Sequence, residues 1–404
     1  MWTMWMRYVR FIMRRKESAT CELFSQRFTA AIQRIREGKS VMGIRVLHVL
    51  DKISVDSGVS SVVMNYYTKL EHDKVTFDFM LNEDTDVKTR AYIEGNGSNI
   101  YVMPKLKSAD AFQYLKALKE FYKNHDYKII HGHVANSAVF YLGLGKNIPY
   151  RIIHSHSIKS SDILWKRIRN WFLTRFIKGV ANRYVACSEE AAKFLFGRIH
   201  NVTILNNAID MEKFIFNKEK RREIRSSLEL KDETVIGHVG RFSPVKNHDF
   251  LIDVFHEVYR NNKNTRLLLI GNGELYGKIV QKVKKLGLEE VILFLGATDN
   301  VGAYMSAMDV FMLPSLFEGL GLAGIEAQTS GLQVLASENV PRVMNVTGNV
   351  DFLKLDKAMW VQKILALQAD RGRQEQGDKV KGSRFDIETQ SQQLCKYYEK
   401  LLES

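Results

Sequence analysis

The amino-acid sequence predicts an α/β protein made of two doubly wound, Rossmann-like domains, each with a parallel sheet covered by helices. The chain has 404 residues, which is more than a single hydrophobic core usually holds. From residue 43 onward, short β-branched runs alternate with helical stretches, and a second series of the same kind begins after residue 230. Two such series indicate two domains, because each strand–helix–strand unit adds a parallel strand to its own sheet.

The strands are read from short apolar runs that are typical of parallel strands buried on both faces. The first series comprises IRVLHVL (44–50), KIIHGH (128–133), YRIIHSH (150–156), RYVACS (183–188) and VTIL (202–205). The second comprises TVIGHVGR (234–241), TRLLLIG (265–271), VILFLG (291–296), DVFMLP (309–314) and LQVLAS (332–337). Helices are expected near 60–70, 108–124, 247–261, 274–286, 299–307 and 321–330.

This pattern divides the chain into a first domain at 43–206, a second at 207–385, and a final helix at 386–404 that returns to the first domain. The preceding segment 1–42 mixes Trp, Met and Phe with arginines. One interpretation is an amphipathic helix on a membrane surface. The other is that the natural chain begins at Met42, directly before a strand.

Composition restricts the class of protein. The three cysteines are far apart and odd in number, so we expect no disulfide framework and a reducing, cytoplasmic setting. No run of 18 apolar residues occurs, so no membrane-spanning helix is expected. The formal net charge of +14 favours an anionic partner, which could be phosphate, an anionic membrane surface or nucleic acid.

In open α/β sheets, ligands bind where the strands end. Arg241 and Lys246 follow the first strand of the second series, and a helix then begins near 247. Two cations beside a helix N-terminus suit a diphosphate, although a solvated basic loop fits the spacing equally well. The next strand is followed by GNGEL (271–275), whose glycines allow either close approach of a ligand or a tight turn.

The stretch FEGLGLAGIEAQTSGLQVLAS (317–337) contains two competing motifs. Gly319, Gly321 and Gly324 form the G-x-G-x-x-G pattern of a dinucleotide site, which would indicate an oxidoreductase. Glu318 and Glu326 are acceptors suited to sugar hydroxyls. The sugar interpretation is favoured, because PSLFE delays the first glycine after the strand and Glu318 would repel a pyrophosphate.

With these motifs the chain resembles the family-4 glycosyltransferases of the GT-B architecture, over about residues 44–365, and is similar to capsule and exopolysaccharide enzymes. The matching motifs are Gly240–Arg241 with Lys246, Pro314–Gly319 with the pair Glu318 and Glu326, Asn207–Asp210, His131 with His133, the glycine loop DSGVSSVVMNYY, and RIIHSHS. Ala208, Ser57 and Gln333 stand where the family usually has Gly, Gly and Pro.

The resemblance implies a retaining hexosyltransferase that needs no metal and no cofactor and uses a nucleotide sugar, expected to be UDP-linked. Glu318, His133, Arg241 and Lys246 would be catalytic. The donor would be bound by Gly58, Arg241, Lys246, Gly271, Gly296, Glu318, Gly319, Gly321, Leu322 and Glu326, and the acceptor side would contain His154 and His156. A nucleotide-sugar epimerase of the same architecture is the alternative.

Two further patterns bear on metal and partners. Asp84 and Asp86 form a D-x-D, interpreted as solvated surface. The two His-x-His pairs lack a Cys or Glu at ligand spacing, so no metal is expected, and His131 and His154 are interpreted as half-buried strand residues. The segment 159–183 mixes aromatic and basic residues, which suits a helix on an anionic membrane or an ordinary amphipathic helix. Its helical period argues against nucleic acid. We therefore expect a peripheral protein on the cytoplasmic face, with a glycan or polyprenyl-diphosphate-linked acceptor.

Overall fold

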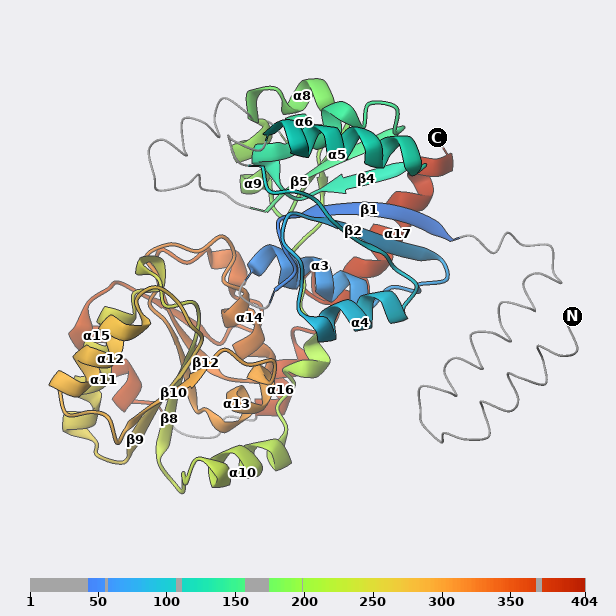
Figure 1. Cartoon of the computed structure of the whole chain (residues 1–404). Helices are drawn as coiled ribbons and strands as arrows, with labels where there is room; N and C mark the ends of the chain where they lie inside the picture. Colours follow the sequence, from blue (N-terminus) through green and yellow to red (C-terminus); the bar gives the residue numbers. More distant parts are fainter. Residues whose placement is uncertain are drawn as a thin grey trace, which may run out of the picture.

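The computed structural model describes residues 43–54, 57–106, 111–156, 174–197, 199–367 and 373–403. The predicted extension 1–42 and most of the segment 159–183 lie outside these residues. Two lobes, each built on one parallel sheet, make up the described molecule (Figure 1). The predicted fold class is therefore confirmed.

The first sheet has seven strands in the order β3-β2-β1-β4-β5-β6-β7. They are β1 (Ile44–Leu50), β2 (Val75–Leu81), β3 (Ile100–Val102), β4 (Ile129–Gly132), β5 (Tyr150–Ser155), β6 (Arg183–Ala186) and β7 (Thr203–Ile204). The helices α3 (Gly58–Thr68), α4 (Val87–Gly95), α5 (Ala111–Asn124), α6 (Ala138–Leu144), α8 (Ile177–Val180) and α9 (Glu189–Phe196) connect them. The sheet separates two apolar clusters, because neighbouring residues of a strand point to opposite faces.

The second sheet has six strands in the order β10-β9-β8-β11-β12-β13. They are β8 (Thr234–Val239), β9 (Thr265–Ile270), β10 (Ile292–Gly296), β11 (Val310–Leu313), β12 (Gln333–Ser337) and β13 (Val350–Leu353). The helices are α10 (Lys218–Ser227), α11 (His248–Asn261), α12 (Tyr276–Lys285), α13 (Val301–Ala307), α14 (Leu322–Thr329), α15 (Lys357–Leu365) and α16 (Arg373–Asp378). In both sheets the order reverses beside the first strand of the series, which is where such folds bind ligands.

The sequence interpretation missed three strands, β2, β3 and β13. Strand β2 is buried along its whole length, and Asp78 in the middle of it interrupts the apolar run. The Asp78 carboxylate accepts two hydrogen bonds from Arg45, at 2.7 and 2.9 Å, one from the backbone N–H of Asn99 and one from Tyr127. A charge can be buried in a strand when it is satisfied in this way.

The final helix, α17 (Ile387–Glu403), packs on α3 and on the first sheet, so the predicted return to the first domain is confirmed (Figure 1). The chain crosses between the sheets at Ile209 and at Asp386, which form a parallel bridge. Lys69, directly after α3, lies between Asp210 and Glu388, at 3.3 and 3.0 Å, and so ties both crossings to the first domain. We propose this pair of crossings as the domain boundary.

Candidate active site

Two loops at the carboxyl edge of the second sheet hold the central ion pair. Lys246 Nζ lies 2.6 Å from Glu318 Oε1, and Ser315 Oγ donates to the same oxygen at 2.6 Å. Leu316 N–H donates to the carbonyl of Val245 at 2.8 Å and thereby joins the loop after β8 to the loop after β11. The two charged side chains are only 20 % and 11 % exposed, so solvent screens them little.

Arg241 does not join this pair. Its guanidinium is 65 % exposed and forms an ion pair with Glu274 at 3.1 Å. Gly240, beside it, has no room for a side chain, because a Cβ would meet His238 Nε2 at 2.9 Å and the Lys246 side chain at 3.3 Å. The structure therefore places Arg241 and Lys246 on the same loop but with different carboxylate partners.

The two helices that begin at this edge have no side-chain caps. Asn247 precedes α11, Gly321 precedes α14, and both adopt left-handed backbone conformations. The first N–H groups of such helices lack intrahelical partners and carry partial positive charge. Both N-termini follow the loops of the ion pair, so N–H groups without intrahelical partners lie near Lys246 at this edge of the sheet.

Glu326 lies inside α14 and is half-buried. Burial raises the pKa of its carboxyl to about 7, and the nearby Lys246 ammonium acts in the opposite direction. The group therefore changes charge near neutral pH, unlike an exposed glutamate.

The predicted donor glycines have different structural roles. A Cβ on Gly271 would meet the Gly240 carbonyl oxygen at 2.1 Å, and one on Gly324 would meet Met344 Sδ at 2.2 Å. These two glycines permit close packing within the protein. At Gly58, Gly296 and Gly319 a Cβ would meet nothing within 4 Å, so their surroundings are open.

Leu322, also predicted to bind the donor, lies at the start of α14. Its side chain packs against the apolar clusters of both lobes. Contact with a donor would therefore involve its backbone.

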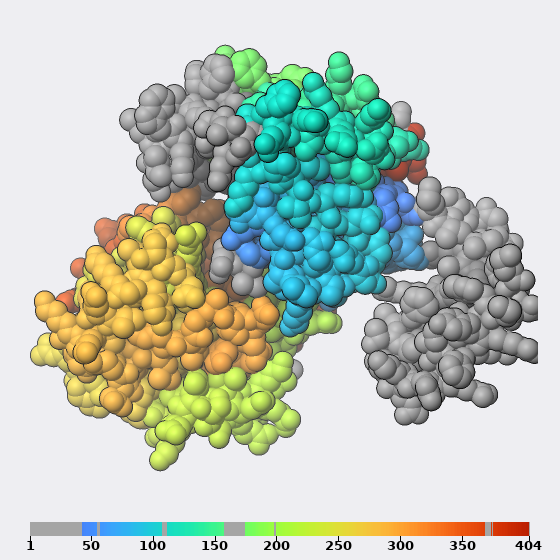
Figure 2. Space-filling model, in the orientation of Figure 1, coloured from blue at the N-terminus to red at the C-terminus, as the bar shows by residue number. Residues whose placement is uncertain are grey.

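A groove of about 790 Å³ lies between the lobes. It is lined on the first lobe by Ser60, Asn65, Thr68, Asp86 and Tyr92, among others, and on the second by Lys213 and residues 297–299. Figure 2 shows the hollow between the blue and cyan lobe and the yellow and orange one. The groove reaches the loop that follows β10, from Ala297 onward, but its lining includes neither Gly296 nor Lys246 nor either predicted glutamate.

The four predicted histidines gather in the first lobe, and a fifth joins them. His48 of β1 pairs in register with His131 of β4, and Tyr398 of α17 donates or accepts hydrogen bonds with both, at 3.2 and 2.6 Å. His133 uses both ring nitrogens within the cluster, toward His48 at 3.0 Å and toward His156 at 2.8 Å. The expectation of half-buried strand residues is wrong for His131 and His154, which are 1 % and 2 % exposed.

The sequence interpretation missed His48 and Tyr398. The signal for His48 is present, because VLHVL places it on the same face of β1 as Val46 and Leu50. Tyr398 lies about 350 residues along the chain from His48, so no local pattern connects them.

Three ring nitrogens, one each from His133, His154 and His156, lie within 4.8 Å of one another, as do those of His48, His131 and His133. The rings of His154 and His156 are stacked, with centroids 3.9 Å apart and planes at 28°. In each group two of the ring nitrogens already form a hydrogen bond with each other, His48 with His133 at 3.0 Å and His133 with His156 at 2.8 Å. Of the predicted surface pair, Asp84 forms an ion pair with Arg90, and Asp86 caps α4.

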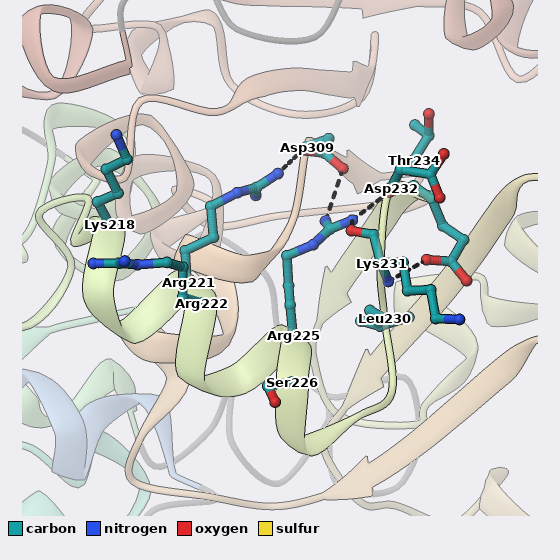
Figure 3. A pocket seen from close by; sticks show the side chains of 11 residues that line it. Lys218, Arg221, Arg222, Arg225, Ser226, Leu230, Lys231, Asp232, Thr234 and Asp309 are labelled. Carbon is teal, nitrogen blue, oxygen red and sulfur yellow. Dashed lines mark hydrogen bonds and ion pairs between the residues drawn. The ribbon is translucent and has the colours of Figure 1, made fainter.

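A second hollow, of about 520 Å³, lies against α10 and contains several basic residues (Figure 3). Arg221 donates to the carbonyls of Ser306, Ala307 and Met308 and pairs with Asp309 at 2.6 Å. Arg225 also donates to Ala307 and lies 3.4 Å from Asp309. These arginines donate to the carbonyl groups at the end of α13 and pair with Asp309. They are therefore not free to bind an anion.

Comparison with known proteins agrees with this geometry. Residues 219–376 match the model of glycosyl transferases group 1, and residues 57–213 match that of glycosyltransferase family 4. A putative glycosyltransferase of Bacillus subtilis, EpsF, is 30% identical over 336 residues, which cover 79% of this chain and 86% of that protein. The chain belongs to the family-4 glycosyltransferases. The resemblance inferred from its motifs is thus confirmed.

Other family members and solved structures extend the comparison. An Escherichia coli UDP-Gal:alpha-D-GlcNAc-diphosphoundecaprenol alpha-1,3-galactosyltransferase is 23% identical, covering 76% of this chain and 80% of its own. Anabaena HepE, solved with UDP and glucose, superposes with a TM-score of 0.72 at 17% identity, covering 88% of this chain and 100% of that chain. WaaG, a lipopolysaccharide glycosyltransferase, gives 0.63 at 13% identity, covering 88% and 95%. The structures share the GT-B fold, and the proteins named here give no support to the epimerase or oxidoreductase alternatives.

Proposed function

We propose that this glycosyltransferase moves a hexosyl group from a UDP-sugar to a lipid-linked or glycan acceptor with retention of configuration, in the synthesis of a capsule or exopolysaccharide. The observation that carries the proposal is the Lys246–Glu318 ion pair between the uncapped N-termini of α11 and α14. These groups supply positive charge where a departing UDP develops negative charge. The E. coli and Anabaena relatives named above support UDP and a diphosphoundecaprenol-linked acceptor.

In this proposal each side chain has a separate task. Lys246 stabilises the leaving diphosphate, and Arg241 leaves Glu274 to reach the same phosphates. Glu318 accepts hydrogen bonds from hydroxyls of the transferred sugar, and Glu326 accepts from the ribose. Gly58, Gly296, Gly319, Gly321 and the backbone of Leu322 border the donor. The departing phosphate oxygen takes the proton of the acceptor hydroxyl, so no protein carboxylate is needed as a base.

The experiment is a screen of nucleotide sugars against diphosphate-linked lipid acceptors, with the anomeric configuration of the product read by NMR. We expect turnover with a UDP-hexose and an α-linked product from an α-linked donor.

We also expect full activity in excess chelator, because Lys246 and the helix N-termini already supply charge to the diphosphate. Activity that disappears in chelator and returns with magnesium would disprove the metal-free mechanism, and an inverted product would disprove retention.

The raised pKa of Glu326 predicts a pH-dependent donor affinity. Ribose hydroxyls donate to the ionised carboxylate, so binding of UDP should strengthen as the pH rises through the pKa of about 7 and level off about one pH unit above it. Removing the carboxylate in Glu326→Ala should weaken binding about 10- to 100-fold, as expected for a charge-assisted hydrogen bond of roughly 1.5–3 kcal/mol. Calorimetric titration with UDP measures both.

The control is Glu326→Gln, because the amide retains the size of the side chain but does not titrate. The terminal phosphate of UDP also titrates, near pH 6, and the glutamine variant isolates that contribution. An identical pH dependence in the wild type and in Glu326→Gln would remove the ribose assignment.

We further propose that the enzyme meets its acceptor on an anionic membrane surface. Among the described residues no helix is long and apolar enough to cross a membrane. The described end of the segment 159–183 contains Arg175, Lys178 and Arg183, together with Phe176, which is 50 % exposed. Basic residues near such a surface contribute about 1 kcal/mol each, and salt weakens them. Sedimentation with anionic vesicles at low but not at high salt is expected, and protein that stays in the supernatant at both would contradict this proposal.

A further inference from the structure

Five imidazoles and one phenol form a continuous hydrogen-bonded chain inside the first lobe. In order along it, the members are His154, His131, Tyr398, His48, His133 and His156. The five links measure 3.2, 2.6, 3.2, 3.0 and 2.8 Å. His48, His131 and His154 lie on strands β1, β4 and β5, His133 and His156 directly follow β4 and β5, and Tyr398 comes from the return helix α17.

The chain is built from neutral groups. Burial, and then the neighbouring imidazoles, lower the pKa of four of the rings, and burial lowers the pKa of His156 to about 4. Burial raises the pKa of the Tyr398 phenol well above its usual value. The other titratable groups that influence this phenol are Tyr66 of α3 and Tyr397 and Cys395 of α17, all of which are uncharged near neutral pH.

Counting protons shows that the chain has a direction. Five neutral imidazoles bring one N–H each and Tyr398 brings one O–H, so six protons serve five links. If every link is made and the phenol donates its own proton to His131 or His48, one proton remains for one of the two ends, Nε2 of His154 or Nδ1 of His156. The end that carries this proton therefore determines, for each of the five hydrogen bonds, which side chain donates and which accepts.

Both end nitrogens are buried and have no hydrogen-bond partner among the described residues. Nearby, Oδ1 of Asn207 is also buried without a partner at hydrogen-bond geometry, but the Asn207 side chain lies close enough to His156 for a side-chain hydrogen bond to oppose the lowering of the His156 pKa. A cavity of about 10 Å³ beside the rings holds at most one water. A buried nitrogen without a hydrogen-bond partner lowers the stability of the folded protein. Of the two ends of the hydrogen-bonded chain, the one formed by His133 and His156 is partly exposed.

We propose that Tyr398 and His48 are positioning residues for the acceptor side of the reaction. They join the two halves of the chain and so hold His133 and His156 in a single hydrogen-bonding pattern, in which Nδ1 of His156 is completed by a hydroxyl of the acceptor. This inference rests on the proposed glycosyl transfer. It also assigns a role to the return helix α17, because among these six side chains only the Tyr398 phenol connects His131 to His48 by hydrogen bonds.

The test is Tyr398→Phe, which retains the buried ring and removes only the hydroxyl. We expect the rate constant for transfer to fall about tenfold, the value of roughly one lost hydrogen bond, with unchanged affinity for UDP. Tyr67→Phe is the matched control, because Tyr67 is an equally buried tyrosine of the same lobe whose hydroxyl bonds to Ser98 outside the chain. The control should transfer at the wild-type rate.

Nitrogen NMR of the imidazoles gives a second readout that needs no activity. In the wild type we expect each ring to populate one neutral tautomer between pH 6 and 8, and in Tyr398→Phe we expect His131 and His48 to exchange between tautomers. A variant that transfers at the wild-type rate, or wild-type rings that titrate independently near pH 6.5, would overturn the inference. A wild-type protein without transferase activity would instead refute the proposed function, and the NMR result would still decide whether the chain exists.

Discussion

Replacing Lys246 with alanine should lower kcat/KM for sugar transfer by about 10²–10³-fold, which is the typical cost of removing one preorganised group that stabilises charge in a transition state. The Lys246 ammonium is 20 % exposed and already oriented by Glu318 at 2.6 Å, so little reorganisation is needed when the diphosphate departs. The loss should appear mainly in kcat, because the leaving group gains its charge during the reaction.

Lys246→Ala also leaves the Glu318 carboxylate, 11 % exposed, without its cation. Lys246→Ala with Glu318→Gln therefore serves as a companion variant, which separates lost catalysis from repulsion of the donor by an unpaired charge. Lys363→Ala is the control, because Lys363 pairs with Asp351 away from this edge and is 40 % exposed. If Lys246→Ala retains more than about a tenth of wild-type kcat/KM, Lys246 does not stabilise the leaving group.

The sequence was sufficient for the elements that bring these groups together. Buried parallel strands are apolar over their whole length, and so runs such as TVIGHV and VFML could be placed to within a few residues of β8 and β11. Once the strands were placed, the residues following them had to share one edge of the sheet. Strand β2 escaped because Asp78 interrupts its apolar pattern, and only the fold reveals the partners that satisfy this carboxylate.

The sequence could not show how side chains share partners. In the sequence Arg241 and Lys246 are expected to bind the same diphosphate. In the structure Arg241 forms an ion pair with Glu274, and Lys246 forms one with Glu318. Gly271 looks like a ligand-binding glycine, but it makes room for the backbone of Gly240. These contacts depend on strand register and on loop packing, which are determined by residues far apart in the sequence as well as by neighbours.

Histidine burial also explains the expected response of the protein to acid. Seven histidines have pKa values lowered by burial, namely His48, His131, His133, His154, His156, His238 and His248. Well above pH 6.5 they are neutral in both the folded and the unfolded chain and do not affect stability. Below pH 6.5 the unfolded chain takes up protons that the folded chain excludes, so acid favours unfolding.

We therefore expect the free energy of unfolding to fall steadily as the pH decreases from 6.5 toward 4. For His156 alone, whose pKa falls from 6.5 to about 4, the loss amounts to about 3 kcal/mol at pH 4. Urea denaturation followed by circular dichroism at several pH values measures it. His156→Gln should show a shallower decline, because glutamine does not titrate. A decline in His156→Gln that is as steep as in the wild type would show that the folded protein does not exclude a proton from His156, and the neutral chain through Tyr398 would then be wrong as well.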